Sequence, residues 1–143
     1  MTPILTLTET ADAAVREVLL NGILRFSEQG AGPAQFRPLV LLMSDAESAA
    51  IIGGLWGRTS WSFLYVELLY VPDLLRGQGF GSQLLQQAEE EALRRGCTGA
   101  WLDTFSFQAP DFYRRRGYTV FGAIEDYPRG HTRYFLRKSL PAE

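Results

Sequence analysis

The segment from residue 63 to residue 96 constrains the fold most, because three different patterns follow one another directly. The apolar run FLYVELLYV predicts a strand, and the loop that follows, within RGQGFGSQLL, carries three glycines in five positions. From Ser82 the apolar residues recur at helical spacing, and Gly96 supplies a stop signal. A glycine turn that opens a helix favours anions, so this segment predicts a phosphate-binding loop.

The glycine spacing argues against two common phosphate loops. A dinucleotide-binding loop would place its third glycine at position 82, where this chain has Ser82. A P-loop requires a lysine directly after its last glycine, and the first lysine in this chain is Lys138. The glycines alone therefore leave the ligand open.

The remaining patterns predict a single α/β domain over residues 1–143, in which a mixed sheet packs against helices. Thr10 is the expected N-cap of the first helix, and a polar stretch at 27–35 is an expected loop. Strands are expected at 4–9, 36–45, 49–61, 63–71, 99–105, 118–127 and 133–140, and helices at 10–26, 82–95 and 110–117.

Composition narrows the classes of function. The net charge of -2 gives no general basic character that would suit nucleic acid or an anionic membrane surface. No apolar run approaches the length of a membrane span, and the N-terminus does not resemble a signal peptide. Cys97 and His131 are the single cysteine and the single histidine, which leaves almost no ligands for a metal site. We therefore expect a cytoplasmic protein that holds no metal.

Two motifs together resemble one family. Arg76, Gly79 and Gly81 fit the pattern R/Q-x-x-G-x-G/A of the acetyl-CoA loop in the GNAT superfamily of N-acetyltransferases, and the later stretch APDFYRRRGYTVFG is similar to that family's F-Y-x-x-x-G-Y/F segment. The resemblance covers most of the chain. It implies a mixed, mostly antiparallel central sheet with helices on both faces, and acetyl-CoA as the cofactor.

The resemblance also implies the residues that bind the coenzyme. In the family, loop amides wrap the pyrophosphate, and the strand before the loop receives the pantetheine arm through its backbone. Ser106 stands where many relatives have an asparagine, so its hydrogen bond to the pantetheine amide would have a shorter reach. Arg114 to Arg116 either reach the 3′-phosphate or form a solvated face. The expected contacts are Leu69, Tyr70 and Val71 for pantetheine and Arg76, Gly77, Gln78, Gly79, Phe80, Gly81 and Ser82 for pyrophosphate.

Two residues are expected to carry the chemistry. By resemblance Tyr113 lies near the coenzyme sulfur, where its hydroxyl can donate a hydrogen bond to the departing thiolate. Glu67 is the expected base, because it is the acidic residue of its strand, and strand alternation would place it on the side of Leu69 and Val71. Competing candidates for the base are Asp103, Asp126 and His131.

The resemblance implies transfer of an acetyl group from acetyl-CoA to a primary amine, by direct attack in a ternary complex. We expect a small-molecule acceptor; a protein amine and an acyl-CoA-binding module without turnover are the alternatives, and a homodimer is possible. Aromatic residues suit an amine cation but also build cores. The candidates for lining the acceptor site are Trp56, Trp61, Trp101 and Phe105.

Overall fold

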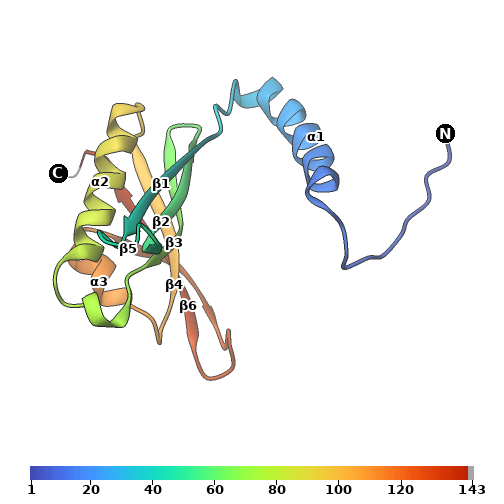
Figure 1. Cartoon of the computed structure of the whole chain (residues 1–143). Coiled ribbons are helices and arrows are strands. Elements are labelled where there is room, and N and C mark those ends of the chain that lie inside the picture. The colour runs from blue at the N-terminus through green and yellow to red at the C-terminus, as the bar shows by residue number, and fades with distance from the viewer. Residues whose placement is uncertain (142–143) are drawn as a thin grey trace. The chain divides into compact units, whose positions relative to one another are not determined.

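The computed structural model describes residues 1–141 and divides the chain into two compact units, Met1–Ala34 and the part from Gln35 onward (Figure 1). Each unit is described by itself. The organisation of the whole chain as a single domain stays a prediction.

The first unit contains one helix, α1 (Ala13–Ala31). The Asp12 carboxylate accepts a hydrogen bond from the Val15 amide at 3.2 Å, so Asp12 is the N-cap and the expectation of Thr10 was wrong. The helix also continues through residues 27–31, which were expected to begin a loop, and it ends before Gly32. Residues 4–9 do not form the expected strand, and alternation of apolar and polar residues does not by itself make a strand without backbone pairing.

The second unit is built on one sheet, which has six strands in its described residues, in the order β1-β2-β3-β4-β6-β5. Neighbouring strands are antiparallel except for β3 and β4, which are parallel. This confirms the mixed, mostly antiparallel α/β fold. The strands are β1 (Arg37–Ser44), β2 (Ile51–Ser60), β3 (Phe63–Tyr70), β4 (Gly99–Phe105), β5 (Thr119–Glu125) and β6 (Thr132–Ser139).

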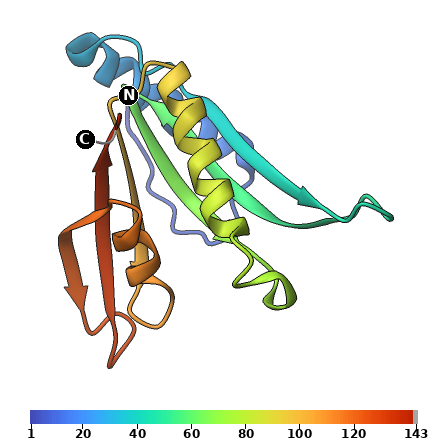
Figure 2. The same ribbon diagram turned by 90° about the vertical axis from the view of Figure 1, so that its left-hand side faces the viewer.

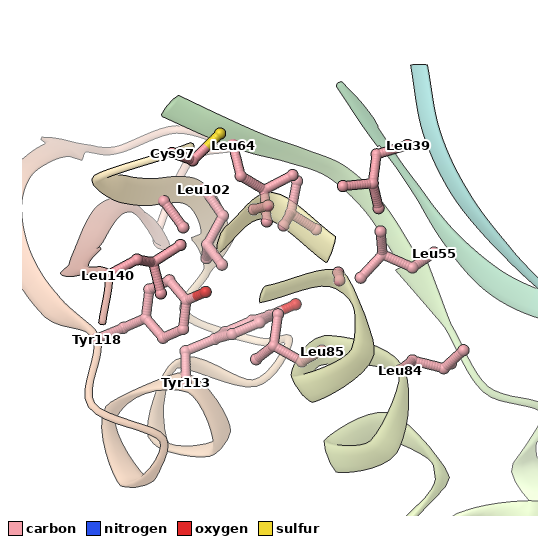
Figure 3. Packing of buried hydrophobic residues seen from close by; sticks show 14 of the residues in the cluster. Leu39, Leu55, Leu64, Leu84, Leu85, Cys97, Leu102, Tyr113, Tyr118 and Leu140 are labelled. Carbon is pink, nitrogen blue, oxygen red and sulfur yellow. The ribbon is translucent and has the colours of Figure 1, made fainter. Parts of the chain in front are cut away.

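Helices α2 (Phe80–Arg94) and α3 (Pro110–Arg115) of this unit lie on the same face of the sheet (Figure 2). As the helical spacing predicts, α2 turns one apolar face inward, and its buried residues are Leu84, Leu85, Ala88 and Ala92. Tyr113 of α3 and Tyr118, just before β5, pack into the same core as α2 and the sheet (Figure 3). A short 3-10 helix, η1 (Asp73–Leu75), joins β3 to the glycine loop.

The two central strands separate along their length. Their pairing ends where Val66 faces Leu102, although β3 runs on to Tyr70 and β4 to Phe105. Figure 2 shows the two halves of the sheet diverging below this point, with α2 packed against the half that contains β1, β2 and β3. The unpaired ends leave backbone donors and acceptors available to an extended ligand.

Candidate active site

A cavity of about 1210 Å³ occupies the gap between β3 and β4. Its wall includes the glycine loop, the first turn of α2, and α3. Tyr113 and Asp103, which lie on opposite faces of the sheet, both contribute to it. The cavity therefore gives access to the gap from both faces.

The glycine loop presents backbone amides to this cavity. Gly77 and Gly79 have φ angles of 79° and 86°, in the left-handed region that favours glycine. Helix α2 starts after Gly79, whose carbonyl accepts its first backbone bond from Gln83 at 3.0 Å. The amides of the three residues between them have no partner within the helix, so this first turn can bind an anion.

Gly81 has a different reason to be glycine. A Cβ at this position would lie 3.2 Å from Cζ of Phe112 in α3, which is closer than nearly all such contacts. The missing side chain lets α3 pack against the first turn of α2. Gln78 is the member of the expected pyrophosphate set that does not line the cavity. Its side-chain amide turns toward η1 and donates to the Leu74 carbonyl at 3.3 Å.

Arg76 lines the cavity but its charge is already paired. Its Nη1 lies 2.8 Å from Oδ1 of Asp73, and its Nε donates to the Val71 carbonyl at 3.0 Å. These contacts brace the link between β3 and the loop. Leu69, Tyr70 and Val71 also line the cavity, at the edge of β3 that β4 no longer covers.

Tyr113 lies at the cavity wall with a side chain that is almost fully buried. Its ring contacts those of Phe112 and Tyr118 edge-on, with centroids 5.1 and 6.0 Å apart. Burial, followed by the charge of Asp103, raises the pKa of Tyr113 to about 12. The phenol is therefore neutral at physiological pH and can act as a hydrogen-bond donor.

Glu67 lines the cavity, but not on the expected side of its strand. Trp56 pairs with Leu68 and Gly57 with Val66, so Glu67 is the additional residue of a β-bulge. The bulge interrupts the alternation: Leu69 and Val71 pack against the core, whereas the Glu67 side chain is 46% exposed and lies 3.9 Å from Arg58. The prediction that Glu67 shares a side with Leu69 and Val71 was wrong.

The competing candidates for the base, two carboxylates and the histidine, differ in whether they line the cavity. Asp103 lines the cavity, and its Oδ1 accepts from Nε of Arg133 at 3.0 Å and lies 2.9 Å from Nη2 of that residue. Asp126 and His131 belong to the β5–β6 connection and do not line the cavity. Glu67 and Asp103 are thus the carboxylates of the cavity wall among the described residues, and each directly follows the last paired residue of its strand, Val66 in β3 and Leu102 in β4.

Of the aromatic candidates for the acceptor site, Phe105 lines the cavity and the three tryptophans do not. Trp101 stacks instead on Tyr65, with ring centroids 4.3 Å apart. Tyr65 itself lines the cavity and was missed from the sequence. The strand pairing of Tyr65 with Trp101, which the sequence does not reveal, turns Tyr65 into a wall residue.

Ser106 is not part of the cavity wall. Its Oγ accepts from the Thr132 amide at 3.1 Å and ties the end of β4 to the start of β6. Gln108 lines the cavity instead, and its Oε1 accepts from the Phe105 amide at 2.8 Å. Because a backbone N–H can only donate, the side-chain oxygen is fixed there and the amide nitrogen remains available. Sequence reasoning missed Gln108, which lies two positions beyond the expected serine.

Comparison with known proteins places this architecture in a family. Residues 20–118 match the acetyltransferase (GNAT) family. The chain is 35% identical over 132 residues to an acetyltransferase of Agrobacterium fabrum, covering 92% of this chain and 96% of the relative. It is 43% identical over 107 residues to the blasticidin-S acetyltransferase of Streptomyces morookaense, covering 73% and 79%. A crystal structure of an acetyltransferase from Bacillus cereus has a TM-score of 0.80 and 32% identity, covering 94% and 98%.

A split sheet with an anion-binding glycine loop at the split is the scaffold of an acyl-CoA-dependent transferase, and the matches agree with that class. The chain belongs to the acetyltransferase (GNAT) family. It is an acetyl-CoA-dependent acetyltransferase of the GNAT type. Each helix in residues 1–141 is too short or too polar to cross a bilayer.

Proposed function

We propose that the protein transfers an acetyl group from acetyl-CoA to a primary amine of a small molecule, by direct attack in a ternary complex. The observation that carries this proposal is the position of a buried, neutral Tyr113 at a gap that also exposes Glu67 and Asp103. The blasticidin-S acetyltransferase among the relatives supports a small acceptor.

The described residues fit the coenzyme. Free amides at the first turn of α2 suit its pyrophosphate, and the uncovered edge of β3 at Leu69 and Tyr70 suits the amides of pantetheine. When bound, acetyl-CoA supplies an activated thioester carbonyl and a thiolate leaving group. A chain that enters along β3 from the loop would bring that thioester toward Tyr113.

Direct attack requires a free amine and a stabilised leaving group. An ammonium of pKa ~10 loses its proton at pH 7 at a cost of about 4 kcal/mol, and the Glu67 carboxylate can accept that proton through water or attract the cation. Attack of the free amine would form the carbon–nitrogen bond as the carbon–sulfur bond breaks, and the remaining extra proton on nitrogen would leave to water. The Tyr113 hydroxyl donates a hydrogen bond to the departing sulfur, whereas complete proton transfer from a phenol of pKa about 12 to a thiolate would be uphill.

The position of the single cysteine supports a mechanism without an acyl-enzyme intermediate. Cys97 is buried in the core cluster, and it does not line the cavity. Burial raises the pKa of its thiol, which disfavours the thiolate that a nucleophile needs.

The test is release of free thiol from acetyl-CoA with a panel of amines. The panel contains blasticidin S, polyamines, amino acids and a lysine-containing peptide, which separates small acceptors from protein amines. A wild-type protein that binds coenzyme A but releases no thiol with any amine would be a binding module, which would overturn the proposed function.

Tyr113→Phe tests the role of the hydroxyl. Loss of one hydrogen bond to a charged group lowers kcat by roughly ten- to a hundredfold and leaves coenzyme A binding unchanged. Tyr134→Phe is the matched control, because Tyr134 packs against the same core but does not line the cavity. Equal rates for wild type and Tyr113→Phe would refute the role assigned to Tyr113.

The cytoplasmic location and the homodimer stay predictions.

A further inference from the structure

The side chain of Arg116 crosses from the end of α3 to the first turn of α2. Its Nε donates to Oγ of Ser82 at 2.6 Å, and its Nη2 contacts the same oxygen. Its Nη1 donates to the Phe112 carbonyl at 2.9 Å, and the guanidinium lies 3.8 Å from the centre of the Phe112 ring. Arg116 is therefore held in place by α2 and α3 together.

These contacts leave part of the guanidinium unused. An arginine has five N–H groups, and the bonds to Ser82 and Phe112 take three of them. One N–H remains on each terminal nitrogen, and both can donate to phosphate oxygens. Since Arg116 lines the cavity beside Ser82, these donors lie at the loop whose amides suit an anion.

Arg116 is also the arginine of the cavity wall whose charge is not neutralised. Arg76 is paired with Asp73, and Arg133 is paired with Asp103. Among residues 1–141, no carboxylate forms an ion pair with Arg116. Arg116 thus brings to the glycine loop a positive charge that no ion pair in the described residues offsets, whereas Arg76 is held by an exposed pair with Asp73.

We propose that Arg116 binds the pyrophosphate of coenzyme A and, through that contact, positions α3 with Tyr113 at the gap. This inference rests on the proposed use of acetyl-CoA at the same site. Tyr113 lies in α3, three residues before Arg116, which is the C-cap of that helix, so an anion held between Arg116 and Ser82 fixes α3 against α2. Arg116 is a coenzyme-binding and positioning residue.

The neighbouring arginine provides a matched control. Arg115 is exposed and does not line the cavity, and Arg114 pairs with Asp111 at 2.9 Å. Arg116→Gln and Arg115→Gln remove the same charge from adjacent positions. Both variants change the net charge of the protein equally. A difference in their ligand affinities therefore reflects the position of the charge.

The experiment measures binding of three ligands by calorimetric competition: coenzyme A, dephospho-coenzyme A without the 3′-phosphate, and pantetheine without any phosphate. We expect Arg116→Gln to weaken binding of the first two by about ten- to a hundredfold and to leave pantetheine unchanged. Arg115→Gln should bind all three as the wild type does. Arg116→Lys keeps the charge without the fork, and it should show a smaller loss with the same dependence on ligand.

Two outcomes would overturn the proposal. A loss confined to coenzyme A would show that Arg116 contacts the 3′-phosphate, and an equal loss for pantetheine would show that Arg116 only supports the fold. If Arg116→Gln does not fold, the ligand dependence of Arg116→Lys decides between the same outcomes. Binding needs no acceptor, so a wild type without transferase activity would overturn the proposed function while leaving this comparison intact.

Discussion

A largely buried ion pair holds α2 against β6, and breaking it should destabilise the fold. Nζ of Lys138 lies 2.7 Å from Oε1 of Glu89, and the two side chains are 13% and 12% exposed. The Tyr118 hydroxyl donates to the other carboxylate oxygen at 2.8 Å. The ring of Tyr118 in turn contacts that of Tyr113, so the pair also supports the tyrosine that we propose donates to the leaving sulfur.

Lys138→Met removes one charge and leaves the Glu89 carboxylate in its buried position. Removing one partner of a buried pair costs about 3–5 kcal/mol, and the hydrogen bond that Tyr118 still donates places the expected loss near 3 kcal/mol. For a chain of this size, that loss lowers Tm by roughly 10 °C. Adding Glu89→Gln keeps an acceptor for Tyr118 and removes the unpaired charge, so the double variant should recover more than half of the lost stability.

Thermal and urea unfolding followed by circular dichroism measure these differences. Arg94→Met is the control, because Arg94 pairs with Glu91 on the surface of the same helix and its side chain is 66% exposed. That variant should lose less than about 1 kcal/mol. The reasoning fails if Lys138→Met is no less stable than Arg94→Met, or if the double variant is less stable than Lys138→Met.

Two further predictions concern the cavity itself. Gln108→Leu removes the amide nitrogen available to the pantetheine arm, so coenzyme A and pantetheine should both bind about three- to tenfold more weakly in calorimetry; unchanged affinities would exclude Gln108 from the contact. Because the pKa of Tyr113 is raised from about 10 to about 12 by folding, stability should fall between pH 10 and pH 12, by about 3 kcal/mol from this residue. Urea unfolding at pH 9 and pH 11.5 should show a smaller fall for Tyr113→Phe than for the wild type, and equal falls would contradict the burial argument.

Local patterns predicted most of the second unit. Adjacent residues predicted an apolar strand, a glycine loop and a helix with a buried face at Leu84 and Leu85. The structure contains these three elements in that order. The strand expected at 4–9 failed because alternation describes one strand and says nothing about a partner. The N-cap at Asp12 was missed because Thr10 and Asp12 both suit that position in sequence.

Side-chain positions at the site were harder to predict because they depend on contacts distant in sequence. The bulge at Glu67 arises from the register between β2 and β3, which sequence alternation does not contain. The Ser106 hydroxyl accepts a hydrogen bond from the Thr132 amide, 26 residues away, and Gln108 lines the cavity instead of Ser106. Such pairings come from the assembled sheet.

There is a physical reason why the charge proposed to bind phosphate, that of Arg116, comes from the end of α3 and not from the glycine loop. Gly77 and Gly79 adopt φ angles that strain other residues, and a Cβ at Gly81 would press on the Phe112 ring at 3.2 Å, so these three positions supply amides and disfavour a side chain that could carry a cation. A guanidinium that reaches in from α3 avoids this conflict. Because Ser82 and a backbone carbonyl already hold Arg116, little additional side-chain entropy is lost when it meets an anion. A six-residue helix is marginal by itself, so an anion bridging it to α2 would stabilise the helix that carries the Tyr113 hydroxyl.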